Sequence, residues 1–195
     1  MFITTLIVLN LVALNTVPVI TETKSRQRDQ RVKYFKIDRI NNCDPADQFL
    51  VTMLPEYSVN NKPNENLFNC TLRTKEEIEG PLKYEANIRR CEMDLSKCEF
   101  FNTIETDVLC EYFEDAGFRN RFLNSISQPL TCPVQPGDYQ FINTKWDMSA
   151  IVNLPGSGYR WKIVTSVKQT ATGRIVYCVE MMARIVVIRK KGNRI

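Results

Sequence analysis

Residues 159–188 read YRWKIVTSVKQTATGRIVYCVEMMARIVVI, and this stretch decides the fold. From Tyr159 to Val167 every second residue is apolar or Thr, and its neighbours are mostly polar. This period of two predicts a strand with one buried face. The pair Thr172-Gly173 predicts a turn, and the largely apolar run at 175–188 predicts a long final strand. Together they predict an antiparallel hairpin.

The same period recurs upstream. It is clearest at residues 82–89, where Leu82, Tyr84, Ala86 and Ile88 alternate with charged or amide residues. Such alternation is typical of a half-buried strand. Further strands are expected at 31–37, 49–54, 57–59, 66–73 and 139–143. The fold class is therefore mainly β, with two antiparallel sheets as the simplest way to bury these faces.

One segment changes period. Apolar residues four apart, from Ile104 to Ala116, form a helical stripe. Asn102 and Glu105 have the spacing of a capping box, and Gly117 can end the helix in a left-handed conformation. We therefore predict a short helical insertion over about residues 103–127.

The N-terminal 20 residues carry no charge and resemble the apolar core of a signal peptide. A membrane anchor is the alternative, which Asn10, Asn15 and Pro18 disfavour. We expect residues 1–20 to be a signal peptide, 21–30 a flexible basic arm and 31–190 a single domain. No later apolar run reaches the length of about 18 residues that a membrane span needs. The expected location is secreted and extracellular, with no membrane span after cleavage.

The chain holds no His, and no CxxC pair or glycine-rich phosphate loop. A zinc site or a Ser or Cys nucleophile normally needs some of these. We therefore expect no enzyme activity, no metal and no cofactor. The net charge is +4, with basic residues gathered at both ends. Anionic lipid or nucleic acid could attract them, but solubility is the simpler explanation, and no nucleic-acid motif is present.

Seven cysteines, all beyond residue 42, indicate an oxidising compartment. Six of them can pair in fifteen ways. Their positions suggest a seven-residue clip, a bridge around the helical insertion and a tie between the first and last strands. These pairs would be Cys91–Cys98, Cys110–Cys132 and Cys43–Cys178. Cys70 would then be a free, buried thiol, and Asn69 begins a glycosylation sequon with it.

Aromatic residues gather in the helical insertion and between residues 139 and 161. They could fill an ordinary core, which composition alone favours, or line a cavity between two curved sheets.

Four short motifs resemble a known family. They are residues 130–139 (LTCPVQPGDY), 141–143 (FIN), 154–155 (LP) and 158–161 (GYRW). They look like insect CheB-like secreted chemosensory proteins, which are related to the ganglioside-activator and ML lipid-recognition family. The suggested disulfide layout is similar as well. The resemblance implies an ML-like β-cup whose apolar cavity holds a lipid or a cuticular-hydrocarbon-like pheromone, with a role in taste or pheromone perception.

We expect aromatic side chains to line this cavity. The candidates are Phe101, Phe118, Phe122, Phe141, Trp146 and Trp161. The alternative is a secreted β-sandwich without a cavity, which binds a sensory receptor or channel through its surface. The basic residues Arg189, Lys190 and Lys191 would then contribute to that surface.

Overall fold

The computed structural model describes residues 30–63, 65–123, 125–146 and 158–190. The expected signal peptide (1–20) and basic arm (21–30) lie outside them, except for Gln30, which begins the first strand. The strands are β1 (Gln30–Asn42), β2 (Val51–Met53), β3 (Ser58–Lys62), β4 (Glu65–Thr74), β5 (Leu82–Cys91), β6 (Cys98–Thr106), β7 (Gly137–Trp146), β8 (Arg160–Gln169) and β9 (Ile175–Lys190). The helical elements are a 3-10 turn (Ala46–Gln48), α1 (Leu109–Glu114), α2 (Ala116–Phe118) and a π-helical turn (Arg119–Leu123).

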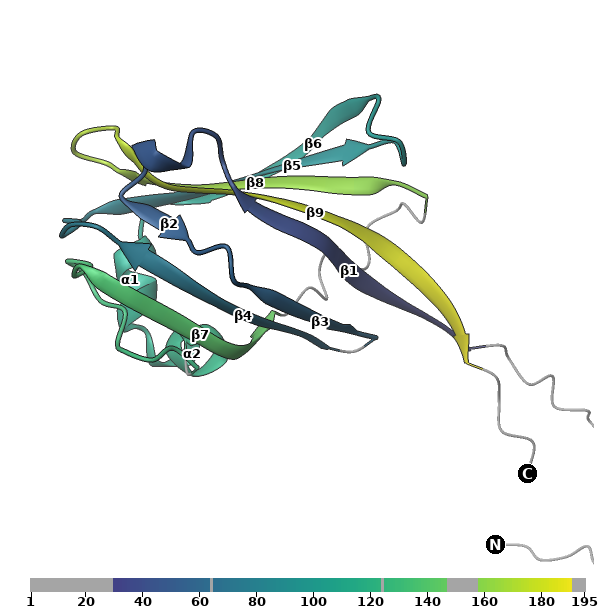
Figure 1. The fold of residues 1–195 in the computed structure, drawn as a ribbon, viewed down its shortest axis with the longest axis horizontal. Coiled ribbons are helices and arrows are strands. Elements are labelled where there is room, and N and C mark those ends of the chain that lie inside the picture. Colours follow the sequence, from purple (N-terminus) through teal and green to yellow (C-terminus); the bar gives the residue numbers. More distant parts are fainter. Residues whose placement is uncertain (1–29, 64, 124, 147–157, 191–195) are drawn as a thin grey trace, which may run out of the picture.

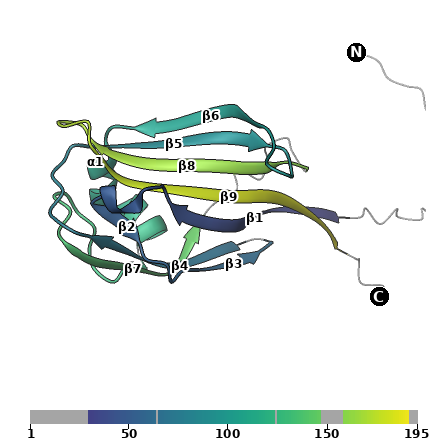
Figure 2. The same ribbon diagram turned by 45° about the horizontal axis from the view of Figure 1, so that its top comes forward.

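The strands form two layers, which Figures 1 and 2 show from two directions. The larger layer has the order β1-β9-β8-β5-β6, all antiparallel. In the smaller layer, β3 and β7 both pair with β4. The short strand β2 joins the layers, because it pairs antiparallel with β4 and parallel with β9. The mainly β fold class is confirmed, and so is the hairpin of β8 and β9.

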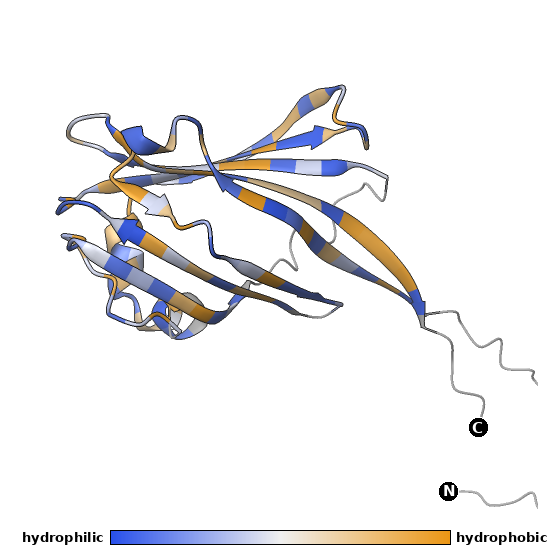
Figure 3. Cartoon of the chain, in the orientation of Figure 1, coloured by the Kyte–Doolittle hydropathy of each residue, from blue (hydrophilic) through white to orange (hydrophobic). Residues whose placement is uncertain are grey.

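The inner faces of the two layers form the core. Trp161 and Ile163 of β8 are buried beside Ile88 of β5, and Phe35 of β1 and Phe68 of β4 close the cluster. Figure 3 shows the corresponding alternation of hydrophobic and hydrophilic residues along the strands. The period of two read from the sequence is thus the inward and outward alternation of these strands.

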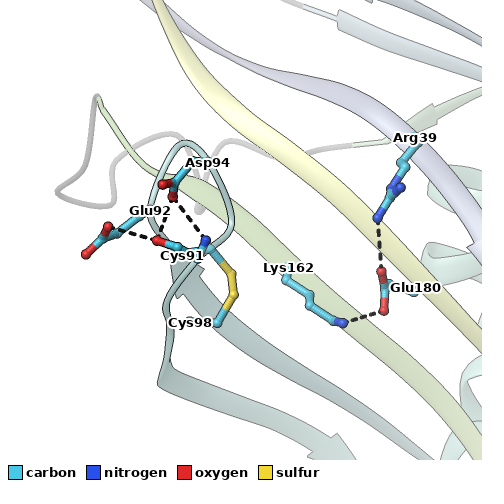
Figure 4. The surroundings of a disulfide bond; sticks show 8 residues. Arg39, Cys91, Glu92, Asp94, Cys98, Lys162 and Glu180 are labelled. Atoms are coloured by element: carbon cyan, nitrogen blue, oxygen red, sulfur yellow. Dashed lines mark hydrogen bonds and ion pairs between the residues drawn. A yellow bond between two sulfur atoms is a disulfide. The ribbon is translucent and has the colours of Figure 1, made fainter.

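The outer face of the larger layer is charged. Glu180 lies between Lys162, at 2.6 Å, and Arg39, at 3.6 Å (Figure 4). Met182, which like Glu180 belongs to β9, is opposite Lys162 and Arg39 in the register and is nevertheless buried. The aliphatic stems of Lys and Arg cover apolar surface while their charged ends stay in water. This explains how Met182 can be buried although it lies on the charged face.

The helical segment begins later than predicted. Strand β6 continues to Thr106, and the first helix starts only at Leu109. Ile104, which belongs to the predicted helical stripe, lies opposite Ala86 of β5 and is half exposed. The edge of β5 offers backbone partners to this segment, and these outweigh the local helical pattern.

The predicted helix ends are wrong as well. Asn102 pairs with Ile88 in the sheet, and Glu105 forms an ion pair with Lys83 at 2.8 Å. Gly117 lies inside α2 instead of ending a helix, and Asp115 caps α2 by accepting a hydrogen bond from the Phe118 backbone.

Candidate ligand cavity

A cavity of about 200 Å³ lies between the two layers, where the helical segment closes one end of them. There α1 packs on β5 and the π-helical turn packs on β7. The cavity wall is almost entirely apolar. Its residues are Val51, Leu72, Thr74, Ile78, Leu82, Tyr84, Leu109, Phe113, Leu130, Val134, Tyr139, Phe141, Val167, Val176 and Tyr177.

Two successive residues of β9 reach the wall because the strand is irregular there. Val167 of β8 is opposite Tyr177, but the next residue of β8, Lys168, is opposite Ile175. Val176 is therefore the extra residue of a β-bulge. Bulges re-aim side chains and often occur next to functional sites. As a result both Val176 and Tyr177 line the cavity, instead of pointing to opposite faces.

The helical side of the wall is held by a disulfide. Leu109 and Phe113, one helical turn apart, face the cavity from α1. Between them in the sequence, Cys110 is bonded to Cys132, which lies in the segment that supplies Leu130 and Val134. The bridge thus holds two separate parts of the wall together.

The close approach of this bridge to the chain requires a glycine. A Cβ atom on Gly80 would lie 2.9 Å from the Cys110 sulfur, which is closer than side chains tolerate. The expected disulfide and the neighbouring Gly80 therefore belong to one packed unit.

Of the six aromatic candidates, the structure places Phe141 in the cavity wall. Trp161 and Phe101 contact each other edge to face, with ring centroids 5.0 Å apart, in the cluster around Phe35. Phe118 packs on Tyr112 and on the cluster beside the cavity. The side chains of Phe122 and Trp146 lie outside the described residues.

Most of the cavity wall therefore lies outside the aromatic clusters of the sequence. The apolar residues of the final strand and the α1 pair Leu109 and Phe113 were visible as periodic core positions. Their spacing predicts that they are buried. Residues of a filled core and residues of a cavity wall are both buried, so the spacing does not distinguish them. A β-bulge such as that at Val176 has no sequence signal here.

The tyrosines of the wall are neutral. Tyr139 donates a hydrogen bond to the Gln135 carbonyl at 2.9 Å. Tyr84 is hydrogen-bonded to the Thr165 side chain. Burial raises the pKa of Tyr84, Tyr139 and Tyr177 above the ordinary value for a phenol. The cavity therefore carries no charge from these groups at physiological pH.

All three expected disulfides are present, namely Cys43–Cys178, Cys91–Cys98 and Cys110–Cys132. The Cys91–Cys98 bridge closes the tip of the β5–β6 hairpin (Figure 4). The turn between them is held by Ser96, whose single hydroxyl proton is shared between the carboxylates of Asp94, at 2.8 Å, and Glu92, at 3.2 Å.

Cys70 is a free and buried thiol on the inner face of β4. Its neighbour Asn69 lies at an irregularity of β4 and bonds to both adjacent strands. The Asn69 amide donates to Ser58 at 3.1 Å and accepts from the Asn143 backbone at 2.7 Å. Glycosylation at Asn69 stays a prediction.

We expect Cys70 to be chemically silent in the folded protein. Burial raises the pKa of its thiol to about 12, so that at pH 8 only about one molecule in ten thousand carries the reactive thiolate. Ellman's reagent should release one equivalent of chromophore only after denaturant is added, and the Cys70→Ala variant should release none. Rapid labelling of the native protein would contradict this burial.

The raised pKa of Cys70 also makes the stability of the fold depend on pH. Because the folded-state pKa lies above the unfolded value near 9.0, the protonated thiol favours folding fully below about pH 9. This contribution is lost as the pH rises towards about 12.

Among the described residues, no group of three or more Cys, Asp or Glu could hold a metal ion. No helix within those residues is long and apolar enough to cross a membrane. The described structure is that of a disulfide-bonded β-sandwich with an apolar cavity, and its three disulfides fit an extracellular protein. A scan against protein-family models and a search of curated proteins found no match to the chain.

Proposed function

We propose that the protein is a secreted, non-enzymatic binding protein that holds a hydrophobic ligand in this cavity. The cavity of about 200 Å³ is the observation that carries the proposal. Interiors of proteins are close-packed, and voids larger than a water molecule are few. This cavity is partly open to solvent, and an apolar ligand that fills it leaves water, which favours binding.

The volume of the cavity limits the size of the ligand. An engineered apolar cavity of about 150 Å³ binds benzene and stays dry otherwise. The present cavity therefore suits a single ring or a short hydrocarbon chain, or the end of a longer chain such as a lipid or a cuticular-hydrocarbon-like pheromone. The sequence resemblance to CheB-like and ML proteins supports this class of ligand and a role in taste or pheromone perception.

A bulky residue in the wall should block the cavity. The Val167→Phe variant places a ring in the cavity, and we expect it to weaken the binding of toluene by more than tenfold. Isothermal titration calorimetry with the disulfide-bonded protein measures this, because Trp161 does not line the cavity and its fluorescence is a poor reporter.

Val164→Phe is the matched control for this experiment. Val164 lies on the same strand, opposite Asn87 and Glu180, which places it on the charged outer face. This variant should bind toluene like the wild type. If the wild type itself shows no saturable binding of any small apolar compound, the proposal is wrong.

The free edge of the larger layer favours a second candidate function. Among the described strands, β6 ends the layer, and its Phe100 and Ile104 are 65% and 51% exposed. An exposed strand edge with apolar residues can bind a partner chain such as a sensory receptor or channel. The basic surface expected at residues 189–191 is described only at Arg189, which is exposed. If the protein acts through this surface and not through the cavity, Val167→Phe would leave the biological activity intact.

A further inference from the structure

Four residues of the cavity wall carry a hydroxyl group, and they differ in their hydrogen bonds. The residues are Thr74, Tyr84, Tyr139 and Tyr177. The Tyr139 hydroxyl is bonded to the Gln135 carbonyl, and the Tyr84 hydroxyl to Thr165. These two groups are already used inside the protein.

The Tyr177 hydroxyl makes no hydrogen bond to any residue that the structure describes. Burial, with Cys70 and Tyr84 nearby, raises its pKa above the ordinary value. The phenol therefore keeps its proton at physiological pH and remains a donor. Tyr177 is half-buried, and its hydroxyl is not one of the fully enclosed side-chain atoms that lack a partner, so this donor stays accessible to a group that enters the cavity.

Water is a poor partner for this donor. A buried water typically makes about three hydrogen bonds to polar groups around it. Beyond Tyr177, the wall offers the Thr74 hydroxyl and two tyrosines whose hydroxyls are engaged, and the rest is apolar. A ligand that brings apolar surface and one acceptor atom fits such a wall better than water does.

The register of β9 places this donor next to the cavity. Tyr177 shares the inner face of the sheet with Val167 of β8 and Val51 of β2, its partners in the register. All three line the cavity. The bulge at Val176 adds an apolar side chain beside the phenol, so a polar donor lies within an apolar wall.

Building on the proposed function, we propose that Tyr177 is the specificity residue of the cavity. It donates a hydrogen bond to the single acceptor oxygen of a small apolar ligand, such as the carbonyl of a ketone, aldehyde or ester. An acceptor-only group is satisfied by this one bond. An alcohol would bring a second donor and would need a further acceptor in the wall.

Two compounds of nearly the same shape test the proposal. Acetophenone carries a carbonyl where α-methylstyrene carries a methylene group, and the two compounds are otherwise alike in size and shape. We expect Tyr177→Phe to weaken acetophenone binding by about 2- to 12-fold, the range for one neutral hydrogen bond. The affinity for α-methylstyrene should stay unchanged. Calorimetry on the disulfide-bonded protein gives both affinities.

Tyr139→Phe and Thr74→Val are the matched controls. Tyr139 lines the same cavity, but its hydroxyl is bonded to Gln135, so its removal should leave the ratio of the two affinities unchanged. The infrared carbonyl stretch of bound acetophenone gives a second readout. It should shift to lower frequency in the wild type and return to its position in an apolar solvent in Tyr177→Phe.

The outcomes separate the two proposals. If neither compound binds the wild type, the cavity function fails, and the role of Tyr177 fails with it. If both bind and Tyr177→Phe changes neither the ratio nor the carbonyl frequency, the cavity function stands and the role of Tyr177 is overturned. A loss of acetophenone binding in Thr74→Val alone would likewise overturn it and assign the donor to Thr74.

Discussion

Removal of the Cys43–Cys178 disulfide should lower the free energy of unfolding by about 5 kcal/mol, the largest effect expected from any of the three bridges. The bridge joins residues 135 positions apart, and in the chain-entropy model a longer loop restricts the unfolded chain more. It also joins the end of β1 to β9, where the Cys43 backbone donates a hydrogen bond to the Cys178 carbonyl at 3.0 Å. Urea unfolding of the Cys43→Ala/Cys178→Ala variant without reductant measures the loss.

The hairpin clip provides the control. Cys91 and Cys98 are only 7 positions apart, so the Cys91→Ala/Cys98→Ala variant should lose about 2 kcal/mol. Equal losses in the two variants would contradict the dependence on loop length. They would show that local packing around each bridge decides its effect.

Trp161→Ala should cost about 3–5 kcal/mol of stability, the range for removing a large aromatic side chain from a core. Trp161 is completely buried and contacts Phe101 edge to face, an arrangement that adds to the effect of burial. Thermal and urea unfolding followed by circular dichroism check this. Since Trp161 lies away from the cavity wall, a folded variant at this position should still bind toluene.

Trp161→Phe is the matched control. It keeps an aromatic ring in the cluster and removes the indole N–H, which has no hydrogen-bond partner among the described residues. Loss of an unsatisfied donor partly offsets the lost volume, so the cost should stay below about 2 kcal/mol. A loss as large as that of Trp161→Ala would show that the indole itself is required.

Two of the predicted aromatic residues have similar positions in the sequence pattern and different places in the structure. Phe141 and Trp161 both lie on strands at inward positions, and the sequence treats them alike. In the structure, Phe141 lines the cavity while Trp161 fills the other cluster. The difference depends on which residues of the facing elements each of them meets, and these residues come from distant parts of the sequence.

The start of the helical segment also depends on the tertiary structure. Its apolar spacing of four was a real signal over Leu109 and Phe113, but it was extended too far toward the N-terminus. Residues 102–106 pair with β5 because an open strand edge lies beside them. A local period competes with non-local backbone hydrogen bonds, and only the tertiary structure shows which of them forms.

The sequence by itself determined the β class, the hairpin at 159–188 and the two faces of its strands, because the period of two is a local property of extended chain. It also pointed to the three disulfide pairs and to Cys70 as the thiol without a partner. Only the tertiary structure decided the cavity, the bulge at Val176 and the position of the Tyr177 hydroxyl. These features arise where residues far apart in the sequence meet, and the packing of two layers against a helical segment leaves a space that no single stretch of sequence records.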